Sequence, residues 1–166
     1  MSGKVPVNIR RNVDSYNDPY IESRSLPENS WCTRCRAVFT SGRWYLKDQF
    51  PGKKFPTDAS LRTVCPACQK ARDKAPGGVV RVTGEFATQH KEEIRNLIHN
   101  ENRKARSVNP LERIISIQSS NSVIEVSTTN EKLAQRIGRA LYKAYSGSVE
   151  YKWSEDTKIA RVNWHR

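Results

Sequence analysis

Long apolar runs are missing from this chain. No stretch approaches the ~18–20 consecutive apolar residues that a membrane-spanning helix needs, so we expect no membrane partner. The N-terminal residues Met1 to Pro6 contain no apolar segment of the kind found in signal peptides. These two absences predict a cytoplasmic protein.

Common catalytic motifs are missing as well. The sequence contains no GxxxxGK[ST] phosphate loop, no GxGxxG before a helix and no GxSxG nucleophile turn. His90 and Glu92 match the H-x-E half of a zinc deaminase signature, but that half precedes its cysteine pair in deaminases and follows both pairs here. We therefore expect a protein that is not an enzyme and has no small-molecule substrate.

Acidic residues are scarce relative to basic ones. The chain has 17 Asp and Glu against 29 Lys and Arg, a formal net charge of +12. More than half of this excess falls within residues 31–76, whereas residues 1–30 are neutral overall. A positive charge concentrated in one segment is typical of proteins that bind nucleic acid or an anionic membrane surface. The other interpretation is a basic protein that its charge keeps soluble.

Cysteine is also rare, and its placement is the most informative feature of the sequence. All four cysteines fall in two C-x-x-C pairs, Cys32/Cys35 and Cys65/Cys68. Two such turns can supply the four thiolates of a tetrahedral structural Zn²⁺ site, in which no coordination position stays open for chemistry. The alternatives are two disulfides, a redox C-x-x-C or an iron–sulfur cluster.

Sequence patterns divide the chain into three segments. Residues 1–30 contain three prolines and no regular apolar period, which predicts an extended arm. Residues 31–76, called the cysteine region below, predict a zinc ribbon with a hairpin of strands 37–39 and 44–46. Residues 77–166, called the C-terminal region below, resemble ordinary globular sequence.

The C-terminal region predicts the element order β-α-β-β-α-β-β. The apolar patterns indicate strands at 79–82, 114–117, 123–126, 149–153 and 160–164, with helices from 88 to about 105 and from a Thr128/Glu131 capping box to Gly147. This order favours an α+β, ferredoxin-like antiparallel sheet with both helices on one face and one extra strand.

The second predicted helix has a narrow basic face. At 100° per residue, Lys132, Arg136, Arg139 and Lys143 share one side, and no acidic residue occurs between Glu131 and Glu150. Like charges at this spacing repel unless an anion meets them. The face is either a phosphate-binding surface or a solvated one.

Short motifs carry a resemblance to a known family. Residues 32–39 (CTRCRAVF), Cys65 to Cys68 and residues 77–80 (GGVV) resemble a small bacterial zinc-ribbon family, as do residues 129–134 (TNEKLA) and 161–164 (RVNW). That family is similar to part of the cysteine-rich region of the nonsense-mediated-decay protein three family, whose members are adapters that bind the large ribosomal subunit and carry more C-x-x-C pairs. The resemblance implies association with the ribosome or ribosomal RNA.

The sequence thus favours a zinc-binding, RNA-binding protein associated with the ribosome, in assembly, hibernation or quality control. A DNA-binding zinc ribbon that acts in transcription and a protein–protein adapter are the alternatives. The predicted zinc ligands are Cys32, Cys35, Cys65 and Cys68. The residues predicted to contact RNA are Arg34, Arg36, Arg43, Trp44, Tyr45, Lys53, Lys54, Arg62, Lys132, Arg136, Arg139 and Lys143. For Trp44 and Tyr45, stacking on an unpaired base competes with packing of the hairpin over the metal site.

Overall fold

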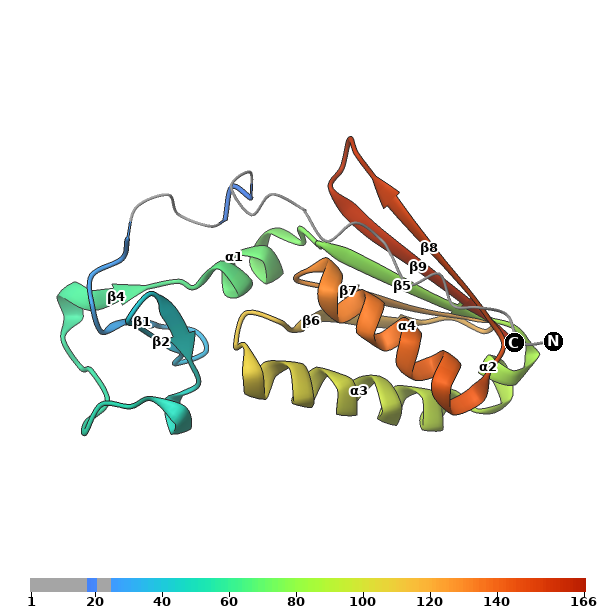
Figure 1. The fold of residues 1–166 in the computed structure, drawn as a ribbon, viewed down its shortest axis with the longest axis horizontal. Helices are drawn as coiled ribbons and strands as arrows, with labels where there is room; N and C mark the ends of the chain where they lie inside the picture. Colours follow the sequence, from blue (N-terminus) through green and yellow to red (C-terminus); the bar gives the residue numbers. More distant parts are fainter. Residues whose placement is uncertain (1–17, 21–24) are drawn as a thin grey trace.

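The computed structural model describes residues 18–20 and 25–166. Its fold is mixed α+β with two mixed sheets. The cysteine region lies at one end of the molecule, and its helix α1 (Pro66–Asp73) lies between its small sheet and the larger sheet (Figure 1). Most of the arm predicted for residues 1–30 falls outside the described residues.

The cysteine region contains a small sheet in the order β3-β2-β1-β4. Its strands are β1 (Ser30–Cys32), β2 (Val38–Thr40), β3 (Arg43–Tyr45) and β4 (Arg62–Thr63). The predicted hairpin is confirmed: β2 and β3 pair antiparallel through Ser41 and Gly42, which both have positive φ. This is the combination that a two-residue hairpin turn requires, and glycine adopts it without a steric cost. Sequence reasoning missed β1, β4 and α1.

The C-terminal region forms a five-stranded sheet in the order β6-β7-β5-β9-β8. Its elements are β5 (Gly78–Thr83), α2 (Glu85–Gln89), α3 (Lys91–Val108), β6 (Ile114–Ser119), β7 (Val123–Thr128), α4 (Glu131–Tyr145), β8 (Ser148–Ser154) and β9 (Ile159–His165). The expected strands are therefore all present, and the final hairpin β8–β9 is antiparallel.

The expected antiparallel character of this sheet is wrong. Strand β9 pairs parallel with β5 and lies between β5 and β8, where a ferredoxin-like sheet would place the strand that directly follows α4. The burial of their side chains accounts for β9, and not β8, lying next to β5. The inward side chains Ala160, Val162 and Trp164 of β9 are fully buried, whereas those of β8 are only partly covered. The more apolar strand takes the inner position.

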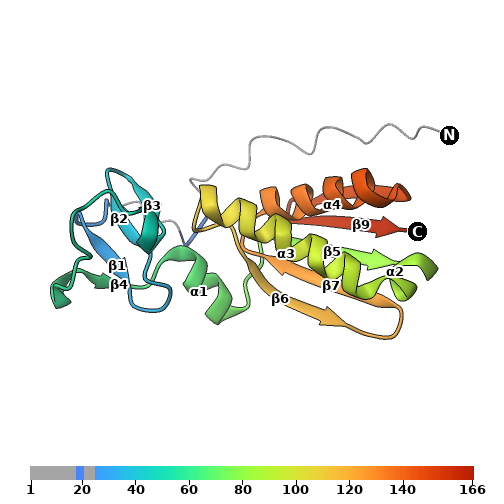
Figure 2. The ribbon, with the colours of Figure 1, turned by 90° about the horizontal axis from the view of Figure 1, so that it is seen from below.

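Helices α3 and α4 lie side by side and pack on the same sheet (Figure 2). The core between them and the strands contains Ile94 and Ile98 of α3, Leu133, Ile137 and Leu141 of α4, and valines and Trp164 from the sheet. Gly138 brings α4 close to the strands, because a Cβ atom there would lie 2.5 Å from Cγ1 of Val162. Both predicted apolar helix stripes face this core.

Two helix starts differ from the prediction. The helix expected from residue 88 is divided at His90, whose φ of −115° and ψ of 33° separate α2 from α3. The expected capping box of Thr128 and Glu131 is wrong, because Thr128 is still part of β7 and is buried. The cap of α4 is Asn130, whose side chain accepts a hydrogen bond from the Leu133 backbone at 3.1 Å.

The two regions meet through side chains that donate to backbone carbonyls. Arg43 Nη2 donates to the Val108 carbonyl at 3.3 Å, and Gln49 Nε2 donates to the Ser107 carbonyl at 3.0 Å. Both acceptors lie at the C-terminus of α3, where unpaired carbonyls attract cations. Lys70 Nζ, which forms an ion pair with Asp18, also donates to the Thr129 carbonyl at 3.1 Å.

Candidate metal centre and basic surface

The two cysteine pairs come from different local structures. Cys32 ends β1, and the chain then turns back through Cys35, with Arg36 N–H donating to the Cys32 carbonyl at 2.9 Å and Arg36 at φ 63°. Cys65 caps α1, and Cys68 lies in the first turn of that helix. The contact between β1 and β4 brings the two turns together.

The four sulfur atoms lie within 4.8 Å of one another, and all four residues are free thiols. The Sγ atoms of Cys35 and Cys65 are 3.7 Å apart, and the Cys65 backbone N–H points at Cys32 Sγ with a donor–acceptor distance of 3.4 Å. Cys32, Cys65 and Cys68 are buried. The predicted ligands thus form one compact group that can hold a metal ion.

The ionisation of these thiols is coupled. Hydrogen bonds from Cys35 and Cys65 lower the pKa of Cys32, whereas the hydrogen bonds that Cys65 donates to Cys32 and Cys35, together with burial, raise the pKa of Cys65. Without a cation the sulfurs therefore share their remaining protons. A divalent ion in their midst displaces those protons and compensates the charge of the thiolates.

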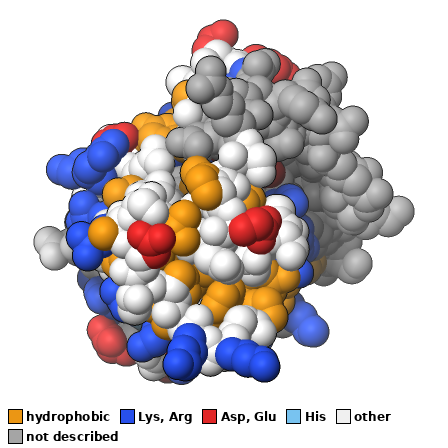
Figure 3. All heavy atoms as spheres, turned by 90° about the vertical axis from the view of Figure 1, so that its left-hand side faces the viewer, with side chains coloured by type: hydrophobic (Ala, Val, Ile, Leu, Met, Phe, Trp, Pro, Cys, Tyr) orange, Lys and Arg blue, Asp and Glu red, His pale blue; other side chains and the backbone are white. Residues whose placement is uncertain are grey.

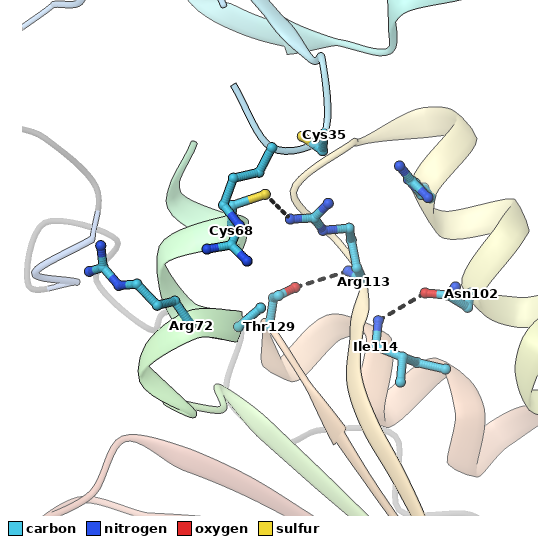
Figure 4. Close-up of a pocket in the computed structure, with 10 residues that line it drawn as sticks. Cys35, Cys68, Arg72, Asn102, Arg113, Ile114 and Thr129 are labelled. Atoms are coloured by element: carbon cyan, nitrogen blue, oxygen red, sulfur yellow. Dashed lines mark hydrogen bonds between the residues drawn. The ribbon is translucent and has the colours of Figure 1, made fainter. Parts of the chain in front are cut away.

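Arg113 contacts the cysteine group, and sequence reasoning missed it. It precedes β6, and its Nη2 donates to Cys68 Sγ at 2.9 Å and points at Cys65 Sγ at 4.0 Å (Figure 4). Burial opposes its charge, but the hydrogen bond to Cys68 and the nearby sulfurs raise the pKa of Arg113. No sequence spacing could signal this contact, because it arises only when the C-terminal region packs against the cysteine region.

A small cluster of apolar side chains packs around the four cysteines. Ala37, Trp44 and Ala67 are buried around the cysteines, and Leu111 of the C-terminal region packs against them. Trp44 is 7% exposed, and its ring lies 5.6 Å from that of Phe39 in an edge-on arrangement. Of the two interpretations of Trp44, this burial favours packing over the metal site. Tyr45 is half-buried, with the guanidinium of Arg43 4.8 Å from its ring centre.

The six basic residues predicted to contact RNA in the cysteine region are all exposed, namely Arg34, Arg36, Arg43, Lys53, Lys54 and Arg62. Two of them lie against aromatic rings. Arg36 lies 4.2 Å from the ring centre of Phe55 and 4.8 Å from that of Trp31, and Arg62 lies 5.6 Å from that of Trp31. Figure 3 views the molecule from the end that contains the cysteine region. Lys and Arg side chains lie around the edge of this face, and two acidic side chains lie nearer its middle.

The basic face of α4 is partly neutralised by its neighbour. Arg136 Nε donates to Glu101 of α3 at 2.8 Å, and Lys104 Nζ donates to the same carboxylate at 2.8 Å. Burial opposes the ionisation of Glu101, but these two hydrogen bonds lower its pKa. Lys132, Arg139 and Lys143 are exposed and form no ion pair with other described residues. Helix α3 therefore provides a carboxylate partner, Glu101, for one of the four cations of α4, namely Arg136.

The predicted RNA-binding residues form two separate groups. Those of the cysteine region and those of α4 come from elements at opposite sides of α1 in the fold (Figure 1). Within the first group, Arg43 is hydrogen-bonded to the Val108 carbonyl of the C-terminal region.

Comparison with known proteins returns no match. The chain matches no family model, no curated protein and no solved structure. Within the described residues, none of the helices is long and apolar enough to cross a membrane.

Proposed function

We propose that this chain is a zinc-binding, RNA-binding protein that acts without catalysis and associates with the ribosome or ribosomal RNA in the cytoplasm. The single observation that carries the proposal is the compact group of four cysteine sulfurs in a region whose predicted RNA-contacting Lys and Arg side chains are exposed. A group that offers four protein ligands leaves no coordination position for substrate, so the ion serves the fold.

The geometry of the sulfurs supports zinc as the metal. Zn–S bonds of ~2.3 Å in a tetrahedron place the sulfurs ~3.8 Å apart, and the Cys35–Cys65 distance is 3.7 Å. The knuckle at Cys32, the helix start at Cys65 and the short strands between them suit a zinc ribbon. For the C-terminal region we propose a variant of the ferredoxin-like fold in which β9 is inserted beside β5.

Charge and exposure support RNA as the partner. The cysteine region has ten Lys and Arg against three Asp and Glu, and four thiolates with one divalent ion leave it clearly positive. Arg34, Lys53 and Lys54 are exposed and make no ion pair with other described residues. Phosphate contacts of this kind carry little sequence information, which fits a large structured RNA as the partner. The choice of the ribosome rests on the resemblance to ribosome-binding adapters.

The test is co-sedimentation of the purified protein with ribosomal particles at low salt. We expect binding that RNase abolishes and that duplex DNA at matched salt competes poorly. Binding should weaken in the double variant Lys53→Gln/Lys54→Gln. The matched control is Lys152→Gln/Lys158→Gln, which removes the same charge from exposed positions of the C-terminal region.

Each alternative has its own outcome. Equal loss of binding in both double variants would indicate a nonspecific effect of net charge. Binding that survives RNase would favour a protein partner, and preference for duplex DNA would favour the transcription-associated alternative. Absence of co-sedimentation at low salt would overturn the proposed function.

A further inference from the structure

A pocket of about 390 Å³ lies at the junction of the two regions. Its lining comes from the knuckle between Cys32 and Cys35, from α1, from the last turns of α3 and from the segment that leads into β6 (Figure 4). Its volume is at the small end of the ~300–1,000 Å³ range of ligand pockets. The pocket is therefore suited to one small group.

Four arginines line this pocket. Arg72 is paired with Asp73, and the other three, Arg34, Arg106 and Arg113, come from three different segments of the chain. Of these three, Arg113 is the one that donates to another described residue, through its hydrogen bond to Cys68. Arg34 and Arg106 form no hydrogen bond or ion pair with other described residues, and Nε of Arg106 is buried without a partner there. A buried donor without an acceptor costs free energy, so such a group calls for a ligand or a water molecule.

Of the other polar side chains of the pocket, Thr129 is already bonded to the Arg113 and Leu111 backbone, whereas Asn102 supplies a further donor. Asn102 lies one helical turn before Arg106, and its Oδ1 accepts the Ile114 backbone N–H at 2.9 Å. This contact fixes the orientation of the amide and leaves its NH₂ group as a donor without an acceptor among the described residues. The pocket lining contains no Asp or Glu and no aromatic ring. Arg72 also lines it, but its side chain points away from Arg113 (Figure 4) and donates to Asp73 at 2.6 Å.

The balance of charge indicates which anion fits. Four thiolates around a divalent ion carry two negative charges in excess, and the three guanidinium groups supply three positive ones. The surplus is one positive charge, which matches the single charge of a phosphodiester better than the double charge of a phosphate monoester. Because no aromatic ring is present for stacking, the pocket contacts a phosphate and not a base.

We propose that this pocket binds one backbone phosphodiester of RNA, held by Arg34, Arg106 and the Asn102 amide beside the metal centre. The proposal rests on the proposed function and goes beyond it, because Arg106 and Asn102 lie outside the predicted RNA-binding set. A phosphate held here contacts both regions at once.

The test measures the affinity for a single-stranded oligoribonucleotide as a function of salt. Arg106→Gln and Arg34→Gln are each expected to weaken binding about tenfold, since a hydrogen bond to a charged group is lost. The slope of log K against log salt should fall by ~0.7, the value for one phosphate on a single strand. Arg103→Gln is the control, because Arg103 is exposed on the same helix and does not line the pocket. Metal content and thermal midpoint are measured for every variant.

A second arm identifies the source of the phosphate. An oligonucleotide with neutral methylphosphonate linkages should bind wild type and Arg106→Gln equally, which supports the proposal. RNA binding that is unchanged in both pocket variants would overturn the pocket and leave the proposed function intact. If the protein binds AMP or inorganic phosphate and not RNA, and Arg106→Gln abolishes this binding, the RNA assignment and the proposed function are both overturned.

Discussion

The cysteine region and the C-terminal region are stabilised in different ways. The core of the C-terminal region contains Trp164 and a continuous set of Ile, Leu and Val side chains from two helices and the sheet. The buried cluster of the cysteine region consists of three cysteines, two alanines and Trp44, and Trp31 and Val38 are the other large apolar side chains buried in this region. So small an apolar core does not hold a segment of this length without a further cross-link. The comparison supports the proposal that a metal stabilises the cysteine region, whereas the C-terminal region has a large apolar core of its own.

The first prediction concerns removal of the metal and carries the largest effect. Chelation, or Cys65→Ser, should unfold the cysteine region and leave the C-terminal sheet intact, because metal binding contributes ~10–16 kcal/mol to comparable zinc modules. Amide NMR resonances assigned to the two regions report this directly. Restoration by added Zn²⁺ is the control. If the resonances of both folded regions disappear together, the C-terminal region also depends on the metal and the two regions do not differ in what stabilises them.

The second prediction truncates the apolar core. Leu141→Ala should destabilise the C-terminal region by about 2–5 kcal/mol, since Leu141 is fully buried. Denaturant unfolding and metal stoichiometry are measured together, and the stoichiometry should not change. Val108→Ala is the control, because Val108 is 69% exposed and its truncation should cost less than about 0.5 kcal/mol. Loss of metal in Leu141→Ala would contradict the independence of the two regions.

The third prediction addresses the contact between the regions. Arg113→Gln should weaken metal binding about 10–100-fold, the usual effect of removing a hydrogen bond to a metal ligand. Competition with a chromophoric chelator measures this affinity. Arg161→Gln, at an exposed position of β9, is the control. An unchanged affinity would mean that Arg113 does not stabilise the thiolates.

The fourth prediction has the smallest effect and tests the bridge between α3 and α4. Glu101→Gln should lower the free energy of unfolding by about 1 kcal/mol at neutral pH, because two charged hydrogen bonds lose their acceptor charge. The folded pKa of Glu101 lies below its ordinary value of 4.5. Its contribution is therefore present above that value and is lost as the pH falls through the folded pKa.

Denaturant unfolding of Glu101→Gln and wild type at neutral and acidic pH checks this. The two proteins should converge in acid, and Glu125→Gln, at an exposed position of β7, should show no such dependence. A difference that persists at acidic pH would rule out the charge of Glu101 as its cause.

Prediction from sequence succeeded where the signal is local. The hairpin turn at Ser41 and Gly42 and the apolar stripes of α3 and α4 follow from residue preferences over a few positions. Prediction from sequence failed where two local preferences compete for the same residues. Thr128 has the spacing of a cap, but pairing with β5 keeps it in β7 and Asn130 caps the helix instead.

Strand order and charge pairing lie beyond local signals. The hairpin β8–β9 is visible in the sequence, but which of its strands joins β5 depends on how much apolar surface each can bury against α4. Likewise α4 has no acidic residue after Glu131 to balance its four cations, and Glu101 reaches one of them only because α3 packs alongside.

Spacing determines each cysteine pair by itself, because two residues between cysteines turn both side chains toward one centre, and the pairing of β1 with β4 then brings the four sulfurs together. The long-range packing of the two regions supplies Arg113, the Arg34–Arg106 pocket and the burial of Trp44. A tight turn is encoded within a few residues, whereas a contact between residues 45 positions apart, such as Arg113 with Cys68, exists only once both regions have folded and met.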